Sequence, residues 1–170
     1  MDARSESHTP MKNRTTAERK SDRELVVTRT INGPARLVFE AWSKPELFKQ
    51  WWTPKSAGMT IVSCEMDVRT GGSYRLVIKH PAAPQPMAFF GKYMEVTPGA
   101  RIVWTNEESG DAGQISTVTF EEEAGKTLVT MLELYPSKEA LDEAIASGSQ
   151  AGTMETFDQM EEFVATLAAS

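Results

Sequence analysis

Cysteine is almost missing from this sequence of 170 residues: Cys64 stands alone, so no disulfide can form within the chain. Cys64 lies among alternating apolar residues, and we expect a buried, unreactive thiol. No apolar run is long enough to span a bilayer, and the N-terminus lacks the charged start and apolar stretch of a signal peptide. These absences predict a cytoplasmic protein that is not held in a membrane.

Basic residues are too few for a surface that binds nucleic acid. The sequence has 18 Lys and Arg against 24 Asp and Glu, a formal net charge of −6. No basic stripe interrupts the acidic balance after the first two dozen residues. We therefore expect neither nucleic acid nor an anionic membrane surface as a partner.

Catalytic and cofactor motifs are also missing. His8 and His80 have no partner at the spacing of a zinc site, and a single cysteine cannot complete one. The sequence contains no nucleophile elbow, no P-loop and no dinucleotide fingerprint. We expect no metal, no cofactor and no catalytic residue that a motif identifies.

The clearest pattern in the chain is an amphipathic helix over residues 150–168. Its apolar residues are three and four positions apart, which is the period of one helical face. Glu155, Asp158, Gln159 and Glu162 are predicted on the opposite face. The apolar face comprises Met154, Phe157, Met160, Phe163, Val164 and Leu167.

Upstream of this helix the chain is mostly strand. Residues 24–32 alternate and are β-branched, and two short helices follow, the second begun by a capping box from Ser43 to Glu46. Six strands are predicted over residues 59–68, 73–80, 87–96, 101–107, 113–122 and 126–135, with Tyr74, Leu76 and Ile78 on one face of the second of them. A helix is predicted over 137–146, and Ser147-Gly148-Ser149 separates it from the last helix. Short links between consecutive strands indicate an antiparallel meander. The fold class is therefore α+β, with one domain over residues 24–170.

Residues 1–23 are polar and lack a hydrophobic period, so we predict a disordered N-terminal tail. Met11 is a second candidate for the start of translation.

In strand 59–68 the alternation places Val62, Cys64 and Met66 on one face.

Aromatic and acidic residues supply the candidates for a site. Rings gather in the predicted helical pair, in the strands and in the last helix, which fits either a core filled by rings or the wall of an apolar pocket. Among carboxylates, Glu133 stands mid-strand in phase with Val129 and Met131, so a hollow on that face would desolvate it and raise its pKa. Glu65 and Glu161 are weaker candidates of the same kind.

Several blocks resemble the AHSA1 family, the activator-of-Hsp90-ATPase homologue 1-like proteins. The first block is Asn32-Gly33-Pro34-Ala35 with Val38-Phe39-Glu40-Ala41-Trp42, followed by Pro45-Glu46-Leu47 and Gln50-Trp51-Trp52. Later blocks are Gly71-Gly72-Ser73-Tyr74-Arg75, Gly91-Lys92-Tyr93 with Glu95, Arg101-Ile102-Val103-Trp104-Thr105, and Gly152 with Phe157-Asp158-Gln159-Met160. The resemblance covers about residues 24–168.

This resemblance implies the SRPBCC superfamily, also called START-like or Bet v 1-like, with a helix-grip fold. In that fold a curved seven-stranded antiparallel sheet wraps round a long C-terminal helix, with two short helices after the first strand. Such proteins usually hold a hydrophobic cavity between sheet and helix. The family name also implies an Hsp90-type chaperone as a partner, and with it a role in the stress response.

Our leading hypothesis is a non-enzymatic protein, monomeric or weakly dimeric, that binds a small apolar molecule, lipid-like or aromatic. The alternatives are a cyclase or hydrolase-like enzyme that uses a buried carboxylate, and a module that modulates a chaperone. The expected ligand-binding residues are Trp42, Trp51, Tyr74, Phe89, Trp104, Met131, Glu133, Phe157 and Met160.

Overall fold

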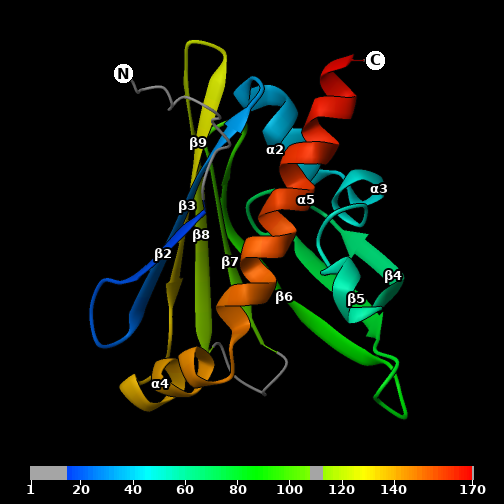
Figure 1. Ribbon diagram of the computed structural model, residues 1–170, viewed down its shortest axis with the longest axis vertical. Coiled ribbons are helices and arrows are strands. Elements are labelled where there is room, and N and C mark those ends of the chain that lie inside the picture. The colour runs from blue at the N-terminus through cyan, green and yellow to red at the C-terminus, as the bar shows by residue number, and fades with distance from the viewer. Residues whose placement is uncertain (1–14, 108–112, 170) are drawn as a thin grey trace, which may run out of the picture.

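The computed structural model describes residues 15–107 and 113–169 and contains one sheet with four α-helices (Figure 1). The first half comprises β2 (Thr16–Arg19), β3 (Glu24–Asn32), α2 (Ala35–Ser43), α3 (Pro45–Phe48), a 3-10 turn (Lys55–Ala57), β4 (Thr60–Met66) and β5 (Ser73–Lys79). The second half comprises β6 (Met87–Thr97), β7 (Arg101–Asn106), β8 (Gln114–Glu123), β9 (Lys126–Leu134), α4 (Lys138–Ala146) and α5 (Ser149–Ala169).

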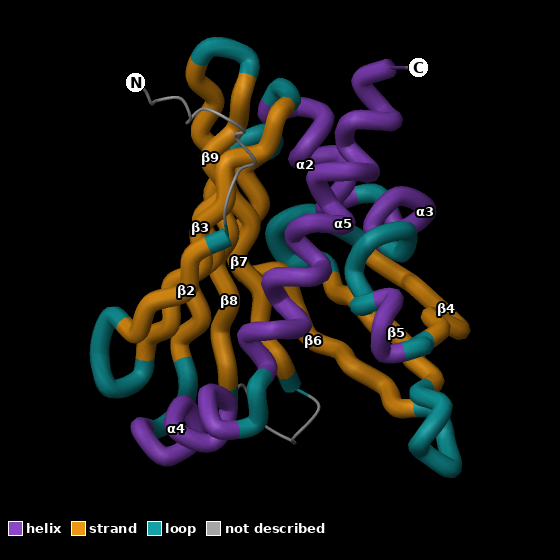
Figure 2. The backbone as a smooth tube through the Cα atoms, viewed as in Figure 1, coloured by secondary structure: helices purple, strands orange, loops and turns teal. Residues whose placement is uncertain are grey.

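The sheet is antiparallel throughout, in the order β2-β3-β9-β8-β7-β6-β5-β4. The long helix α5 runs across the sheet, and the direction of the strands changes gradually from β3 to β4 (Figure 2). The predicted α+β helix-grip fold is thereby confirmed. One detail differs, because the sheet has eight strands and we predicted seven.

The eighth strand, β2, forms in the segment that we predicted to be a disordered tail. It pairs with β3, with Thr16 opposite Thr28 and Arg19 opposite Leu25. Its residues are mostly exposed, so its backbone pairing was not visible as a hydrophobic alternation. The remainder of the predicted tail, residues 1–14, lies outside the described residues.

Helix α5 confirms the amphipathic helix, but its buried face is rotated from the expected one. Phe157, Met160 and Val164 are buried, whereas Met154 is 40% exposed and Gln159 only 8%. Gln159 is buried because its amide satisfies three backbone groups. Its Nε2 donates to the carbonyl oxygens of Trp51 (3.0 Å) and Thr53 (2.8 Å), and its Oε1 accepts from the N–H of Lys55 (2.9 Å).

Charged side chains of α5 also bind the rest of the domain. Arg29, a buried residue of β3, pairs with Asp158 and Glu161. Glu155 accepts hydrogen bonds from the N–H and the hydroxyl of Ser56. The side of α5 expected to face solvent is therefore fastened to β3 and to the segment around residues 51–57.

The junctions between helices follow local backbone rules. Gly148 takes φ +79° and separates α4 from α5, as the interruption in the sequence predicts. The capping box at Ser43 was wrong, because Lys44 is the N-cap of α3 and no side chain caps it. Lys44 precedes Pro45, which disfavours the helical region for it, and it adopts an extended conformation instead.

A β-bulge in β4 changes which residues face the core. The register of β4 against β5 shifts between Ile61 and Ser63, and Val62 is 59% exposed. The predicted common face of Val62, Cys64 and Met66 was therefore wrong at Val62, since one extra residue reverses the alternation.

Among the helices of the described residues, none combines the length and apolar character that crossing a membrane requires.

Candidate ligand-binding site

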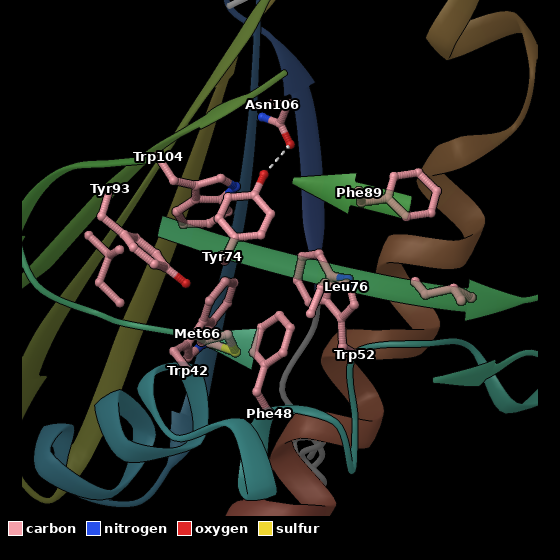
Figure 3. A pocket seen from close by; sticks show the side chains of 12 residues that line it. Trp42, Phe48, Trp52, Met66, Tyr74, Leu76, Phe89, Tyr93, Trp104 and Asn106 are labelled. Atoms are coloured by element: carbon pink, nitrogen blue, oxygen red, sulfur yellow. Dashed lines mark hydrogen bonds between the residues drawn. The ribbon is translucent and has the colours of Figure 1, made fainter. Parts of the chain in front are cut away.

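An apolar pocket of about 220 Å³ lies between the α2–α3 region and the sheet half formed by β4 to β7 (Figure 3). One wall is aromatic and comes from α2, α3 and the turn after α3. The other wall is the inner face of the four strands. The lining residues are Trp42, Phe48, Trp52, Met66, Tyr74, Leu76, Ile78, Phe89, Tyr93, Ile102, Trp104 and Asn106.

Trp42 is the centre of the aromatic wall. Its ring lies 4.9 Å from that of Trp51 and 5.9 Å from that of Trp104, centroid to centroid. Phe48 stacks on Trp52 at 4.6 Å. Rings in such edge and offset contacts hold each other in place, so this wall is rigid and strongly apolar.

Strand alternation positions the opposite wall. Tyr74, Leu76 and Ile78 occupy alternate positions of β5 and face inward, as the sequence predicts. Gly91 of β6 stands opposite Tyr74, and a Cβ there would approach the carbonyl oxygen of Thr105 to 2.0 Å. Only glycine therefore permits this close contact between β6 and β7 beside the pocket.

Two polar side chains interrupt the apolar lining. The hydroxyl of Tyr74 donates to the carbonyl oxygen of Thr105 at 2.7 Å, and Asn106 Oδ1 lies 3.4 Å from the same hydroxyl (Figure 3). An apolar cavity with a few placed polar groups is the usual form of a small-molecule site. Asn106 and Tyr74 therefore give the pocket a polar end.

Glu133 lies on the inner face of β9, opposite Ser116 of β8. Burial raises the pKa of its carboxyl group to about 7, although hydrogen bonds from Ser116 and Gln114 act in the other direction. The Nε2 of Gln114 donates to Oε2 at 2.9 Å, and Oε1 is buried with no partner among the described residues. The sequence left open whether this face looks inward; in the structure it does, but Glu133 is not part of the pocket lining.

The nine expected ligand-binding residues divide into two groups. Trp42, Tyr74, Phe89 and Trp104 line the pocket. Trp51, Met131, Phe157 and Met160 are buried outside its lining, and Glu133 on β9 is separated from β7, the last strand of the pocket, by β8. Which of the nine contact a ligand stays a prediction.

The pocket also differs in place from the cavity that the resemblance implied. None of its lining residues comes from α5. Phe157 of α5 packs against Trp42 with 6.3 Å between ring centroids, and Trp42 in turn lines the pocket. The last helix supports the aromatic wall from behind, because bulky rings of α2 fill the space directly beneath it.

Eight lining residues were not among the expected ligand-binding residues. Leu76 and Ile78 follow from the alternation that starts at Tyr74, and Asn106 stands two residues after Trp104 on the same face. Phe48 and Trp52 share the aromatic segment with Trp42. Met66, Tyr93 and Ile102 required the pairing of four strands to be recognised.

Other candidates from the sequence have structural roles or lie apart. Glu161 pairs with Arg29, and Glu65 is exposed on β4. Cys64 is half-buried beside Met66, and burial raises the pKa of its thiol. Within residues 15–107 and 113–169 no group of three or more His, Cys, Asp or Glu could hold a metal ion.

Comparison with protein families gives one match. The model described as activator of Hsp90 ATPase homolog 1-like protein matches residues 32–165, which is most of the chain. No protein with a curated description matches the sequence.

Solved structures share the fold over nearly their whole length. A protein from Rhodobacter sphaeroides has a TM-score of 0.81 at 20% identity, with 90% of this chain and 99% of that chain covered. A protein from Staphylococcus epidermidis has a TM-score of 0.75 at 29% identity, covering 89% and 94%. An AHSA1-like protein from Aeromonas hydrophila has a TM-score of 0.67 at 18% identity, covering 85% and 95%.

Proposed function

The chain belongs to the family of activator of Hsp90 ATPase homologue 1-like proteins, and we propose that it binds a small, largely apolar molecule in the pocket between α2–α3 and β4–β7. The observation that carries this proposal is the pocket itself. It is a hollow of about 220 Å³ between the helical pair and the sheet, and eleven of its twelve lining residues are aromatic or aliphatic, Asn106 being the exception.

The size of the pocket sets the size of the molecule. An engineered apolar cavity of about 150 Å³ accepts benzene, whereas drug-sized ligands occupy roughly 300–1,000 Å³. A volume of about 220 Å³ lies between these values. The proposed ligand is therefore a molecule with one or two rings, or with a short aliphatic chain. The flat faces of a ring can lie against Trp42 and Trp104.

The proposed function is binding without catalysis. An enzyme of the kind considered above would need Glu133 to touch the bound molecule as an acid or base. Glu133 lies partly buried on β9, and the pocket ends at β7, so β8 stands between them. Among residues 15–107 and 113–169, no carboxylate lines the pocket.

Calorimetric titration with naphthalene and with 2-naphthol tests this function, because both fit a one- or two-ring site. Leu76→Phe lengthens a buried side chain of the pocket wall, and we expect it to abolish binding. Leu128→Phe is the matched control: Leu128 is half-exposed on the opposite face of the sheet, and the same enlargement there should leave the affinity unchanged. Equal binding by both variants, or no binding by the wild type, would contradict the proposal.

A second candidate function is modulation of an Hsp90-type chaperone. The family match over residues 32–165 favours it, since the family is described by activation of the Hsp90 ATPase. The test is the ATPase rate of the host's own Hsp90 at saturating concentrations of this protein. An unchanged rate would discard this candidate and leave the proposed ligand binding unaffected.

A further inference from the structure

A chain of hydrogen bonds links the polar end of the pocket to the interior of the sheet. Asn106 Nδ2 donates to the carbonyl oxygen of Gln114 and to the hydroxyl oxygen of Ser116, each at 3.2 Å. Ser116 is 1% exposed and stands opposite Glu133 in the pairing of β8 with β9. Gln114 Nε2 donates to the carboxyl group of Glu133 at 2.9 Å.

These partners fix the orientation of the Asn106 amide. The carbonyl oxygen of Gln114 can only accept, so the NH₂ group of Asn106 must face it. A reversed amide would place Oδ1 against that carbonyl oxygen and lose this bond. Asn106 Oδ1 is consequently held on the side of the pocket, where Figure 3 shows it directed towards Tyr74.

The hydroxyl of Ser116 strengthens this arrangement. Its oxygen accepts from Asn106 Nδ2 at 3.2 Å, so the NH₂ group is bonded to both Gln114 and Ser116. Ser116 therefore acts as a positioning residue, because its oxygen helps to hold the amide with Oδ1 on the side of the pocket.

The acceptor at Asn106 has spare capacity. A carbonyl oxygen has two lone pairs, and the contact with the Tyr74 hydroxyl is long at 3.4 Å, while that hydroxyl makes its short bond of 2.7 Å to Thr105. An amide oxygen that lines an otherwise apolar pocket favours ligands that carry a hydrogen-bond donor. A ligand without a donor displaces water from that oxygen and leaves it without a hydrogen bond.

We propose that Asn106 Oδ1 accepts a hydrogen bond from the bound molecule, so that the ligand is an apolar molecule carrying one uncharged donor, a hydroxyl or an N–H group. This inference rests on the proposed function and adds the polar group to it. The donor is taken as uncharged because no described residue of the lining is a carboxylate that could pair with a cation.

The test compares two molecules of nearly the same shape, 2-naphthol and 2-methylnaphthalene, by calorimetric titration. Only the first can donate to Asn106. The quantity of interest is the ratio of their dissociation constants, measured in the wild type and in Asn106→Leu. We expect the preference for 2-naphthol to fall by about tenfold in the variant, the usual effect of leaving one buried donor unpaired.

Two further variants separate a specific effect from a general one. Ser116→Ala removes the oxygen that orients the amide and is a small change, so it tests the proposal even if Asn106→Leu does not fold; we expect a smaller fall in the same ratio. Ile102→Val trims the apolar wall and contains no polar group, so both affinities should change by the same factor.

The outcomes distinguish this inference from the proposed function. If both molecules bind the wild type and the ratio is unchanged in Asn106→Leu and Ser116→Ala, the assignment of Asn106 is overturned and the apolar site stands. If neither molecule binds the wild type, the proposed function fails, and the assignment of Asn106 fails with it.

Discussion

The indole Nε1 of Trp42 donates a hydrogen bond to the sulfur atom of Met160, with 3.0 Å between the two atoms. Trp42 belongs to α2 and lines the pocket, while Met160 is a fully buried residue of α5. This contact is how the last helix, which does not line the pocket, still positions its wall. It also explains a methionine in the core, since no aliphatic side chain could accept this hydrogen bond.

Met160→Leu should lower the free energy of unfolding by about 1–3 kcal/mol, because it leaves the buried N–H of Trp42 without an acceptor while nearly conserving volume. Urea unfolding measures the loss. Met131→Leu is the control: Met131 is also buried, and among the described residues its sulfur makes no hydrogen bond, so the cost should stay below about 1.5 kcal/mol. Equal losses would show that the Trp42 contact contributes nothing specific.

Arg29→Met should lower the free energy of unfolding by roughly 3–5 kcal/mol, because it removes the cation that balances Asp158 and the poorly exposed Glu161. Arg101→Met provides the comparison, since Arg101 and Glu95 form a pair in which both side chains are about half-exposed. Exposed pairs contribute about 0–1 kcal/mol. A loss for Arg29→Met as small as that for Arg101→Met would mean that the Arg29 cluster does not fasten α5 to β3.

Phe157→Ala should cost roughly 3–5 kcal/mol of unfolding free energy, because Phe157 is 1% exposed and packed on all sides. Phe89→Ala should cost clearly less, since Phe89 borders the pocket and already has an unfilled side. Thermal unfolding of both variants under the same conditions gives the comparison. A similar cost for the two would indicate that the pocket is filled in solution.

The unfolding free energy should depend on pH through the titration of Glu133. Its carboxyl pKa is about 7 in the folded protein against 4.5 as the ordinary value, so the folded state holds the proton more tightly than the unfolded state. Its effect favours folding most below pH 4.5 and is lost as the pH rises from 4.5 to 7, by about 3 kcal/mol in all.

The measurement is the difference in unfolding free energy between the wild type and Glu133→Gln across this pH range. Glutamine cannot ionise, so the difference should shift in favour of the variant as the pH rises to 7. A difference that stays constant from pH 4.5 to 7 would show that the carboxyl group of Glu133 titrates normally.

Local patterns in the sequence were enough for most elements of this fold. The alternation of Tyr74, Leu76 and Ile78 and the helical period of Phe157, Met160 and Val164 each reflect a face that must be buried, and both faces are buried in the structure. Gly148 between two helical segments likewise identified their junction, because a left-handed residue ends a helix.

Patterns failed where one residue depends on a distant one. The helical period predicted Gln159 on the solvent face. It is buried because the carbonyl groups of Trp51 and Thr53, which belong to another segment, accept its hydrogen bonds. The alternation predicted Val62 on the core face, but a β-bulge against β5 places it outward. Five of the nine expected ligand-binding residues lie outside the pocket lining, and two of these, Phe157 and Met160 of α5, are covered by Trp42 of α2.

The sequence alone determined the antiparallel sheet and the terminal helix, because burial of periodic apolar residues is a local requirement that every stretch must meet. Only the tertiary structure decided where the hollow lies, and that Asn106 turns an oxygen towards it. Those facts depend on how side chains from four strands and two helices fill a shared volume, and on hydrogen-bond partners such as Gln114 and Ser116 that pairing of the strands brings together.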